Sequence, residues 1–127
     1  MLEVGLTHQS VMRVMDGNTA EFIGSGDMAV LATPAMVALM ENAAVLAVAL
    51  HLGEGETTVG TMISTSHLKA SKVGKYVEAR AELVEIDGRK LDFKIEVRSM
   101  RNGLTFEIAK QMRHIVGNDA ENLSMVI

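Results

Sequence analysis

The sequence predicts an α+β fold in which a curved antiparallel β-sheet wraps around one long central helix. Three observations lead to this prediction. Residues 34–52 form one apolar stretch of helical length, and from residue 57 onward apolar and polar residues alternate with the period of two that is typical of strands. Two dipeptides that favour tight hairpin turns interrupt this alternation, so the strands are expected to run antiparallel.

Ahead of the helix, the chain is expected to contain one strand and one connection. Residues 4–15 are the candidate strand, and residues 17–27 are a glycine-rich segment. Loops on a rigid scaffold often carry function, so the glycine-rich segment is a candidate lid or loop near a site.

The predicted helix has clear start and stop signals. Thr33 is a candidate N-cap, Pro34 suits the first helical position, and Gly53 can end the helix in a left-handed cap. Its most apolar part, residues 35–50, is shorter than the roughly 20 residues that a membrane span needs, and Glu41 interrupts it. We therefore expect a helix buried within the protein and no membrane partner.

After the helix, the alternation predicts four antiparallel strands, each with one face in the core and one in water. The dipeptides that favour hairpin turns are Asp-Gly at residues 87–88 and Asn-Gly at residues 102–103. In the last strand, the alternation would turn Lys110 inward. A bulge near Ala109 would resolve that conflict.

Length and composition narrow the possible functions. At 127 residues the chain is expected to be one domain, residues 1–127. A hydrophobic fraction of 48% is high for a small monomer, so we expect a second copy to cover apolar surface in a homodimer or a tetramer. The net charge of −4, with basic residues spread among acids, offers no basic surface, so no nucleic acid partner is expected.

The chain has no cysteine, which excludes disulfides, thiolate nucleophiles and cysteine-ligated metals. This composition fits a cytoplasmic location, and the N-terminus shows no secretory signal. His8, His51 and His114 lack the spacing that would assemble a metal site with one another or with His67. No metal and no cofactor are therefore predicted.

The candidate reactive groups are a hydroxyl, a carboxylate and an imidazole, on Thr33, Glu41 and His67. A threonine needs a neighbouring base to become a nucleophile, and Glu41 and His67 are the candidate bases. Each residue also has a structural interpretation. Thr33 could cap the helix, Glu41 could pair with a cation across a dimer, and His67 could be an ordinary polar strand residue.

Glu41 stands out because an acid in the middle of an apolar helix is unfavourable unless it has a polar partner or a functional role. Its helical neighbours three and four residues away are all apolar, namely Val37, Ala38, Ala44 and Val45. In such a setting the carboxyl would be a usable base near neutral pH.

Taken together, these residues resemble the hot-dog-fold acyl-CoA thioesterases, and within them the fluoroacetyl-CoA thioesterase-like subgroup. The resemblance covers roughly residues 22–116. The spacing from Thr33 to Glu41 is 41 − 33 = 8 residues, and that from Glu41 to His67 is 67 − 41 = 26 residues. The motifs that carry the resemblance lie at residues 31–33, 39–43, 53–55 and 59–67.

The resemblance implies a hot-dog fold and hydrolysis of a small acyl-CoA thioester to the free acid and coenzyme A, which is part of the substrate. It implies that Thr33 acts at the thioester carbonyl as a nucleophile or positions water. Glu41 would attack the thioester or activate water. His67 would protonate the leaving thiolate or orient the carboxylate.

The resemblance also implies a substrate-binding set of Gly60, Arg113 and Asn42. Arg113 would lie near the acyl pocket, although it could equally be a salt-bridged strand residue. Strict alternation would place Gly60 on the opposite side of its strand from His67, where a backbone amide or close packing is all it need provide. Asn42 could instead be a hydrogen-bonding interface residue.

Two positions depart from the pattern of the similar proteins. Gln111 stands where they often have a histidine, and Ala109 stands where they have a glycine. A preference for fluoroacetyl-CoA is therefore not inferred for this chain from the similar proteins. The acyl chain, and the choice between coenzyme A and acyl carrier protein, stay open.

Two other classes of function stay open as well. A non-catalytic hot-dog dimer could bind acyl-CoA or a small ligand while Glu41 and His67 serve the interface. A purely structural dimer could join its helices through Glu41 and Asn42. A hot-dog dehydratase is disfavoured, because its usual Asp-and-His arrangement is not found on the central helix.

Overall fold

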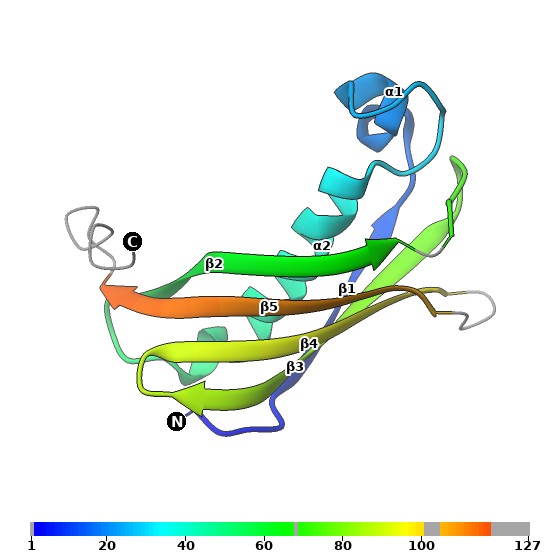
Figure 1. Ribbon diagram of the computed structural model, residues 1–127. Coiled ribbons are helices and arrows are strands. Elements are labelled where there is room, and N and C mark those ends of the chain that lie inside the picture. Colours follow the sequence, from blue (N-terminus) through cyan, green and yellow to red (C-terminus); the bar gives the residue numbers. More distant parts are fainter. Residues whose placement is uncertain (1, 68, 101–104, 118–127) are drawn as a thin grey trace.

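The structure is a computed structural model that describes residues 2–67, 69–100 and 105–117, and of residues 67 and 105–107 it describes only the backbone. Its helices and strands follow the predicted order (Figure 1). They are β1 (Thr7–Arg13), η1 (Asp16–Asn18), α1 (Ala20–Ile23), α2 (Thr33–Val48), η2 (Ala49–His51), β2 (Glu56–His67), β3 (Tyr76–Asp87), β4 (Lys90–Ser99) and β5 (Thr105–Gly117).

The five strands form one antiparallel sheet in the order β1-β3-β4-β5-β2. The sheet curls around α2, which lies on its concave side (Figure 1). The predicted α+β class, a curved antiparallel sheet around one long helix, is confirmed. Strands β1 and β2 are the two edges of the sheet, and β5 lies between β4 and β2.

The core lies between α2 and the inner face of the sheet. In β3 as far as Leu83 and in β4 as far as Val97, every second residue is buried, as the alternation predicted. The segment Thr33–His51 is long and apolar enough to cross a membrane by length and composition, a property that it shares with the central helices of soluble proteins. The buried residues of α2 are Ala35, Met36, Leu39, Met40, Ala43, Ala44, Ala47 and Val48.

The structure confirms the first hairpin. Gly88 has a φ of 60°, and Asp87 pairs with Lys90 across the turn between β3 and β4. The second predicted turn, at residues 102–103, lies outside the described residues.

The predicted ends of the central helix are wrong in detail. Ala32 is the N-cap residue, and Thr33 is the first residue of α2. At the other end the helix tightens into η2 before Gly53. The amide of Gly53 donates a hydrogen bond to Glu56 Oε1 at 2.9 Å, and the left-handed φ of 75° belongs to Gly55.

The predicted bulge near Ala109 is also misplaced. From Ala109 to Ile115, alternate residues of β5 are buried, and Lys110 is exposed. The irregularity lies earlier, because the pairing of β5 with β4 shifts between Glu107 and Thr105. After this shift, the alternation from Ala109 onward already turns Lys110 outward, so no bulge at Ala109 itself is needed.

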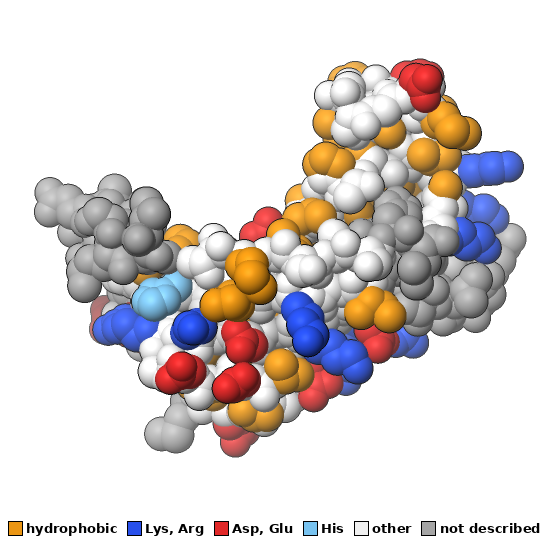
Figure 2. All heavy atoms as spheres, viewed as in Figure 1, with side chains coloured by type: hydrophobic (Ala, Val, Ile, Leu, Met, Phe, Trp, Pro, Cys, Tyr) orange, Lys and Arg blue, Asp and Glu red, His pale blue; other side chains and the backbone are white. Residues whose placement is uncertain are grey.

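The glycine-rich connection contains regular structure. Within it lie η1 and the short helix α1, whose N-cap Thr19 accepts a hydrogen bond from the amide of Phe22 at 3.2 Å. Figure 2 shows hydrophobic side chains gathered at the end of the molecule where Figure 1 places α1. Phe22 is 71% exposed and Met28 is 64% exposed, so the segment presents apolar surface to its surroundings.

Candidate functional site

The carboxylate of Glu41 is the centre of a polar cluster between α2 and the last strand. Its Oε2 accepts a hydrogen bond from Gln111 Nε2 at 3.0 Å and another from Arg113 Nη1 at 3.1 Å. The Glu41 side chain is 40% exposed, whereas that of Arg113 is 6% exposed. The carboxylate thus lies at the boundary between the core and solvent.

The setting of Glu41 is therefore not the apolar one that its helical neighbours suggested. Tertiary contacts supply a cation and an amide donor from β5. A charge-assisted hydrogen bond from the guanidinium and a second one from the amide fix the position of the carboxylate. The predicted cation partner exists, and it comes from the same chain.

Arg113 is held rigidly on the side away from Glu41. Its Nε donates to Thr58 Oγ1 at 2.9 Å, and its Nη2 donates to the Thr58 carbonyl at 3.2 Å. Burial lowers the pKa of Arg113 from its usual value, and the charge and hydrogen bond of Glu41 act in the opposite direction. With partners on three nitrogens, the planar guanidinium has one defined orientation.

Gly60 covers this cluster so closely that a side chain there would force the carboxylate to move. A Cβ atom there would lie 2.6 Å from Glu41 Oε2, 3.1 Å from Gln111 Nε2 and 3.3 Å from Arg113 Nη1. Gly60 pairs with Arg113 across the β2–β5 ladder. The absent side chain is thus what allows the backbone of β2 to approach the carboxylate.

A bulge in β2 corrects the argument from strict alternation. The register shifts between Gly60 and Met62, so the strand has one extra residue there. Gly60 is paired with Arg113 and Ile63 is paired with Gln111, and both β5 partners are buried on the inner face. Counting alternate residues through the bulge therefore places Gly60 on the wrong face of β2, because an extra residue changes which face the following residues take.

The structure brings together Glu41, Gly60 and Arg113 from the predicted set, whereas Thr33 and Asn42 lie elsewhere. Thr33 is exposed and lies roughly 12 Å from Glu41 along the helix axis, at about 1.5 Å per residue. Asn42 Oδ1 accepts a hydrogen bond from Ser10 Oγ on β1 at 2.7 Å, so this side chain lies toward the other edge of the sheet.

His67 is the last residue of β2, and its backbone pairs with Glu107. Its side chain lies outside the described part of the structure, so its role stays a prediction. Among the described residues, no group of three or more His, Asp or Glu side chains could hold a metal ion.

Two residues of the cluster, Gln111 and Thr58, were missed as members of a site. The signal for Gln111 was available, because a polar residue two positions before Arg113 shares its face of the strand. To use that signal, one has to know that Arg113 lies on the face of β5 that points into the core. Thr58 gave no such signal, since threonine is common on ordinary strands.

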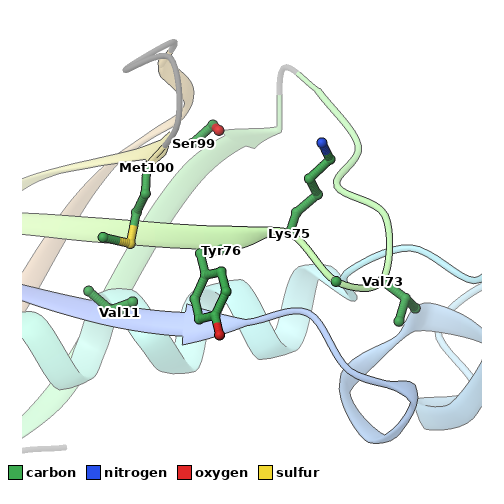
Figure 3. Close-up of a pocket in the computed structure, with 7 residues that line it drawn as sticks. Val11, Val73, Lys75, Tyr76, Ser99 and Met100 are labelled. Carbon is green, nitrogen blue, oxygen red and sulfur yellow. The ribbon is translucent and has the colours of Figure 1, made fainter.

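A separate groove of about 800 Å³ lies on the outer side of the sheet. Figure 3 shows Val11, Tyr76 and Met100 pointing toward one another there, with α2 behind the strands. Arg13 lies 5.9 Å from the centre of the Tyr76 ring. The groove contains none of the residues of the Glu41 cluster.

Comparison with known proteins gives consistent results. A family model described as fluoroacetyl-CoA-specific thioesterase matches residues 14–118. The fluoroacetyl-CoA thioesterase of Streptantibioticus cattleyicolor is 42% identical over 66 residues, which are 52% of this chain. The chain spans about half the length of this curated relative, since the match covers 48% of it.

Solved structures show the same likeness over nearly the whole chain. A structure of a fluoroacetyl-CoA thioesterase superimposes with a TM-score of 0.86 and 26% identity, covering 98% of this chain and 96% of the other. A mutant of that kind of enzyme, in complex with fluoroacetate and CoA, gives a TM-score of 0.86 and 27% identity, covering 95% and 100%. A hot-dog-like protein from Thermanaerovibrio acidaminovorans, at 20% identity and TM-score 0.82, covering 93% and 86%, shares the fold.

Proposed function

This chain belongs to the family of fluoroacetyl-CoA-specific thioesterases, and from that premise we propose that it hydrolyses a small acyl-CoA thioester to the free acid and coenzyme A. The observation that carries the proposal is the Glu41 carboxylate, fixed by Gln111 and Arg113 beneath Gly60 at the edge of the core. A fixed carboxylate with access to solvent is suited to act on a carbonyl carbon or on water.

The reaction can follow two routes from this carboxylate. In one, Glu41 takes a proton from water as the water oxygen bonds to the thioester carbon. In the other, a Glu41 oxygen bonds to that carbon first, and water then hydrolyses the anhydride. In both, the C–S bond breaks and the thiolate takes a proton, for which His67 is the proposed donor.

Negative charge that develops on the thioester oxygen needs hydrogen-bond donors. The backbone near Gly60 is our candidate for a carbonyl that Glu41 attacks. The first amides of α2 have no partner within the helix and carry partial positive charge, and they would serve a carbonyl bound beside Thr33, roughly 12 Å along the helix from Glu41. Thr33, at the first position of α2, is proposed to act beside these donors as nucleophile or to position water.

The working unit is proposed to be a homodimer, with a dimer of dimers as the alternative, in the cytoplasm. Exposed apolar side chains support assembly, since Leu50 at the end of the central helix is 94% exposed and Phe22 is 71% exposed. In such a dimer, one site can combine Glu41 of one chain with His67 of the other. The absence of cysteine supports the location.

The proposed function is tested by measuring thiol release from a panel of acyl-CoA thioesters that includes acetyl-, fluoroacetyl- and long-chain members. Wild type is compared with Thr33→Ala, Glu41→Ala and His67→Ala, and folding is checked by circular dichroism. We expect turnover of a short acyl chain, lost in folded Glu41→Ala and His67→Ala. Tight binding of acyl-CoA without turnover would instead indicate a binding module.

Gly60→Ala tests the close approach of β2 to the carboxylate. The added methyl group would meet Glu41 Oε2 at 2.6 Å, so the carboxylate has to move. We expect kcat/KM for thiol release to fall about 10²-fold, the scale of a displacement of about 1 Å at a reacting group. Gly17→Ala is the control, since a Cβ at Gly17 meets nothing within 4 Å. Equal activity of both variants would show that the carboxylate tolerates displacement.

A further inference from the structure

We propose that Gln111 is a positioning residue that holds Glu41 with its Oε2 occupied, so that Oε1 is the oxygen that reacts. The proposal rests on the proposed function and deepens it. The two hydrogen bonds that described residues donate to this carboxylate, from Gln111 Nε2 and Arg113 Nη1, both end on Oε2. A carboxylate bound in this way keeps the lone pairs of its second oxygen for another partner.

The burial of Gln111 lowers the stability of the fold. The side chain is 1% exposed, and its own Oε1 has no hydrogen-bond partner among the described residues. A buried carbonyl oxygen without a partner destabilises a fold, and an apolar residue of the same length would avoid this cost. The bond from Nε2 to Glu41 is the interaction that such a residue could not make.

The two donors have different tasks. Arg113 supplies charge, and Thr58 holds it on the far side. A single hydrogen bond from Arg113 would still let the carboxylate turn and exchange its oxygens. A second donor on the same oxygen prevents this turn, and because Gln111 is neutral it adds no charge to the site.

The partial exposure of Glu41 fits this assignment. Its side chain is 40% exposed, while both donors to Oε2 come from buried residues of β5. Oε1 accepts no hydrogen bond from the described part of the chain, so it is the oxygen left for a ligand that reaches this half-exposed side chain. In either route of hydrolysis, Oε1 supplies the electron pair, to the proton of water or to the thioester carbon.

The test uses Gln111→Met, which keeps the length of the side chain and removes both the donor and the unpaired oxygen. We expect kcat to fall about 10- to 100-fold with KM changed less than about threefold, because a misplaced group affects the reacting geometry more than binding. The thermal midpoint is expected to stay level or rise, since the unpaired carbonyl is gone. A residue with a merely structural role would lose stability instead.

Two further variants complete the test. Gln111→His keeps a donor and is expected to recover most of the lost kcat. Met112→Gln makes the reverse exchange at the adjacent position of β5, on the outer face, and is expected to match wild type. An unchanged kcat in Gln111→Met, or a loss that tracks a lower thermal midpoint, would overturn the role of Gln111 alone. Absence of thiol release in wild type would overturn the proposed function as well.

Discussion

Replacing Glu41 with glutamine is expected to lower kcat for thiol release by about 10²- to 10⁴-fold while the chain stays folded. The amide has nearly the shape of the carboxylate and can still accept the hydrogen bond of Arg113. It can neither take up a proton at the reacting oxygen nor attack a carbonyl carbon. The measurement is steady-state kinetics on the best substrate of the panel, with folding followed by circular dichroism.

The alanine variant separates chemistry from stability. Glu41→Ala leaves the buried guanidinium of Arg113 without its counter-charge. Because Glu41 is 40% exposed, solvent replaces part of the lost pairing, and we expect a cost of about 1–2 kcal/mol rather than the ~3–5 kcal/mol of a fully buried pair. Glu78→Gln, on the β3 position paired with Arg98, is the matched control and should retain wild-type turnover. A glutamine variant at position 41 that turns over normally would remove Glu41 from the chemistry.

Arg113→Met is expected to lower kcat/KM about 10²-fold, on the scale of losing one preorganised charged donor in an active site. The Glu41 carboxylate would lose its cation, and the Thr58 hydroxyl and carbonyl would lose their donors. The apolar side chain fits a buried position, so the free energy of unfolding should fall by only about 1–2 kcal/mol. Kinetics and urea unfolding measure the two effects separately.

Arg113→Lys distinguishes charge from geometry. Lysine keeps the positive charge but cannot reach Glu41 and Thr58 at once with a planar fork. We expect its kcat/KM to lie between those of wild type and the methionine variant. If the lysine and methionine variants both retained wild-type kcat/KM, Arg113 would be the structural ion-pair residue that its sequence position equally allowed.

The fold was predictable because its signals are local. The apolar stretch that forms α2 and the Asp-Gly turn at residues 87–88 depend only on neighbouring residues, and both predict what the structure contains. The exact end of the helix did not follow from Gly53, because its amide bonds the Glu56 side chain and its φ is not left-handed. Side-chain contacts of this kind compete with the intrinsic preference of glycine for a left-handed cap.

The site was only partly predictable, because its residues come together only if the correct residues of β2 and β5 face the core. Glu41 was found as an acid within an apolar helix, and Gly60 and Arg113 were found from the resemblance. Their grouping depends on two register shifts that no local pattern reveals. Asn42 follows Glu41 in sequence, yet a turn of about 100° per helical residue directs it toward Ser10 on β1. Residues adjacent in sequence thus belong to different surroundings.

The bulge in β2 also bears on solubility. An edge strand of 12 residues is a template for indiscriminate pairing with other chains, and long flat edges are a recognised origin of aggregation. One extra residue between Gly60 and Met62 interrupts the regular spacing of that edge and increases its local twist. The irregularity that follows Gly60 therefore also makes this strand a poorer seed for amyloid-like stacking.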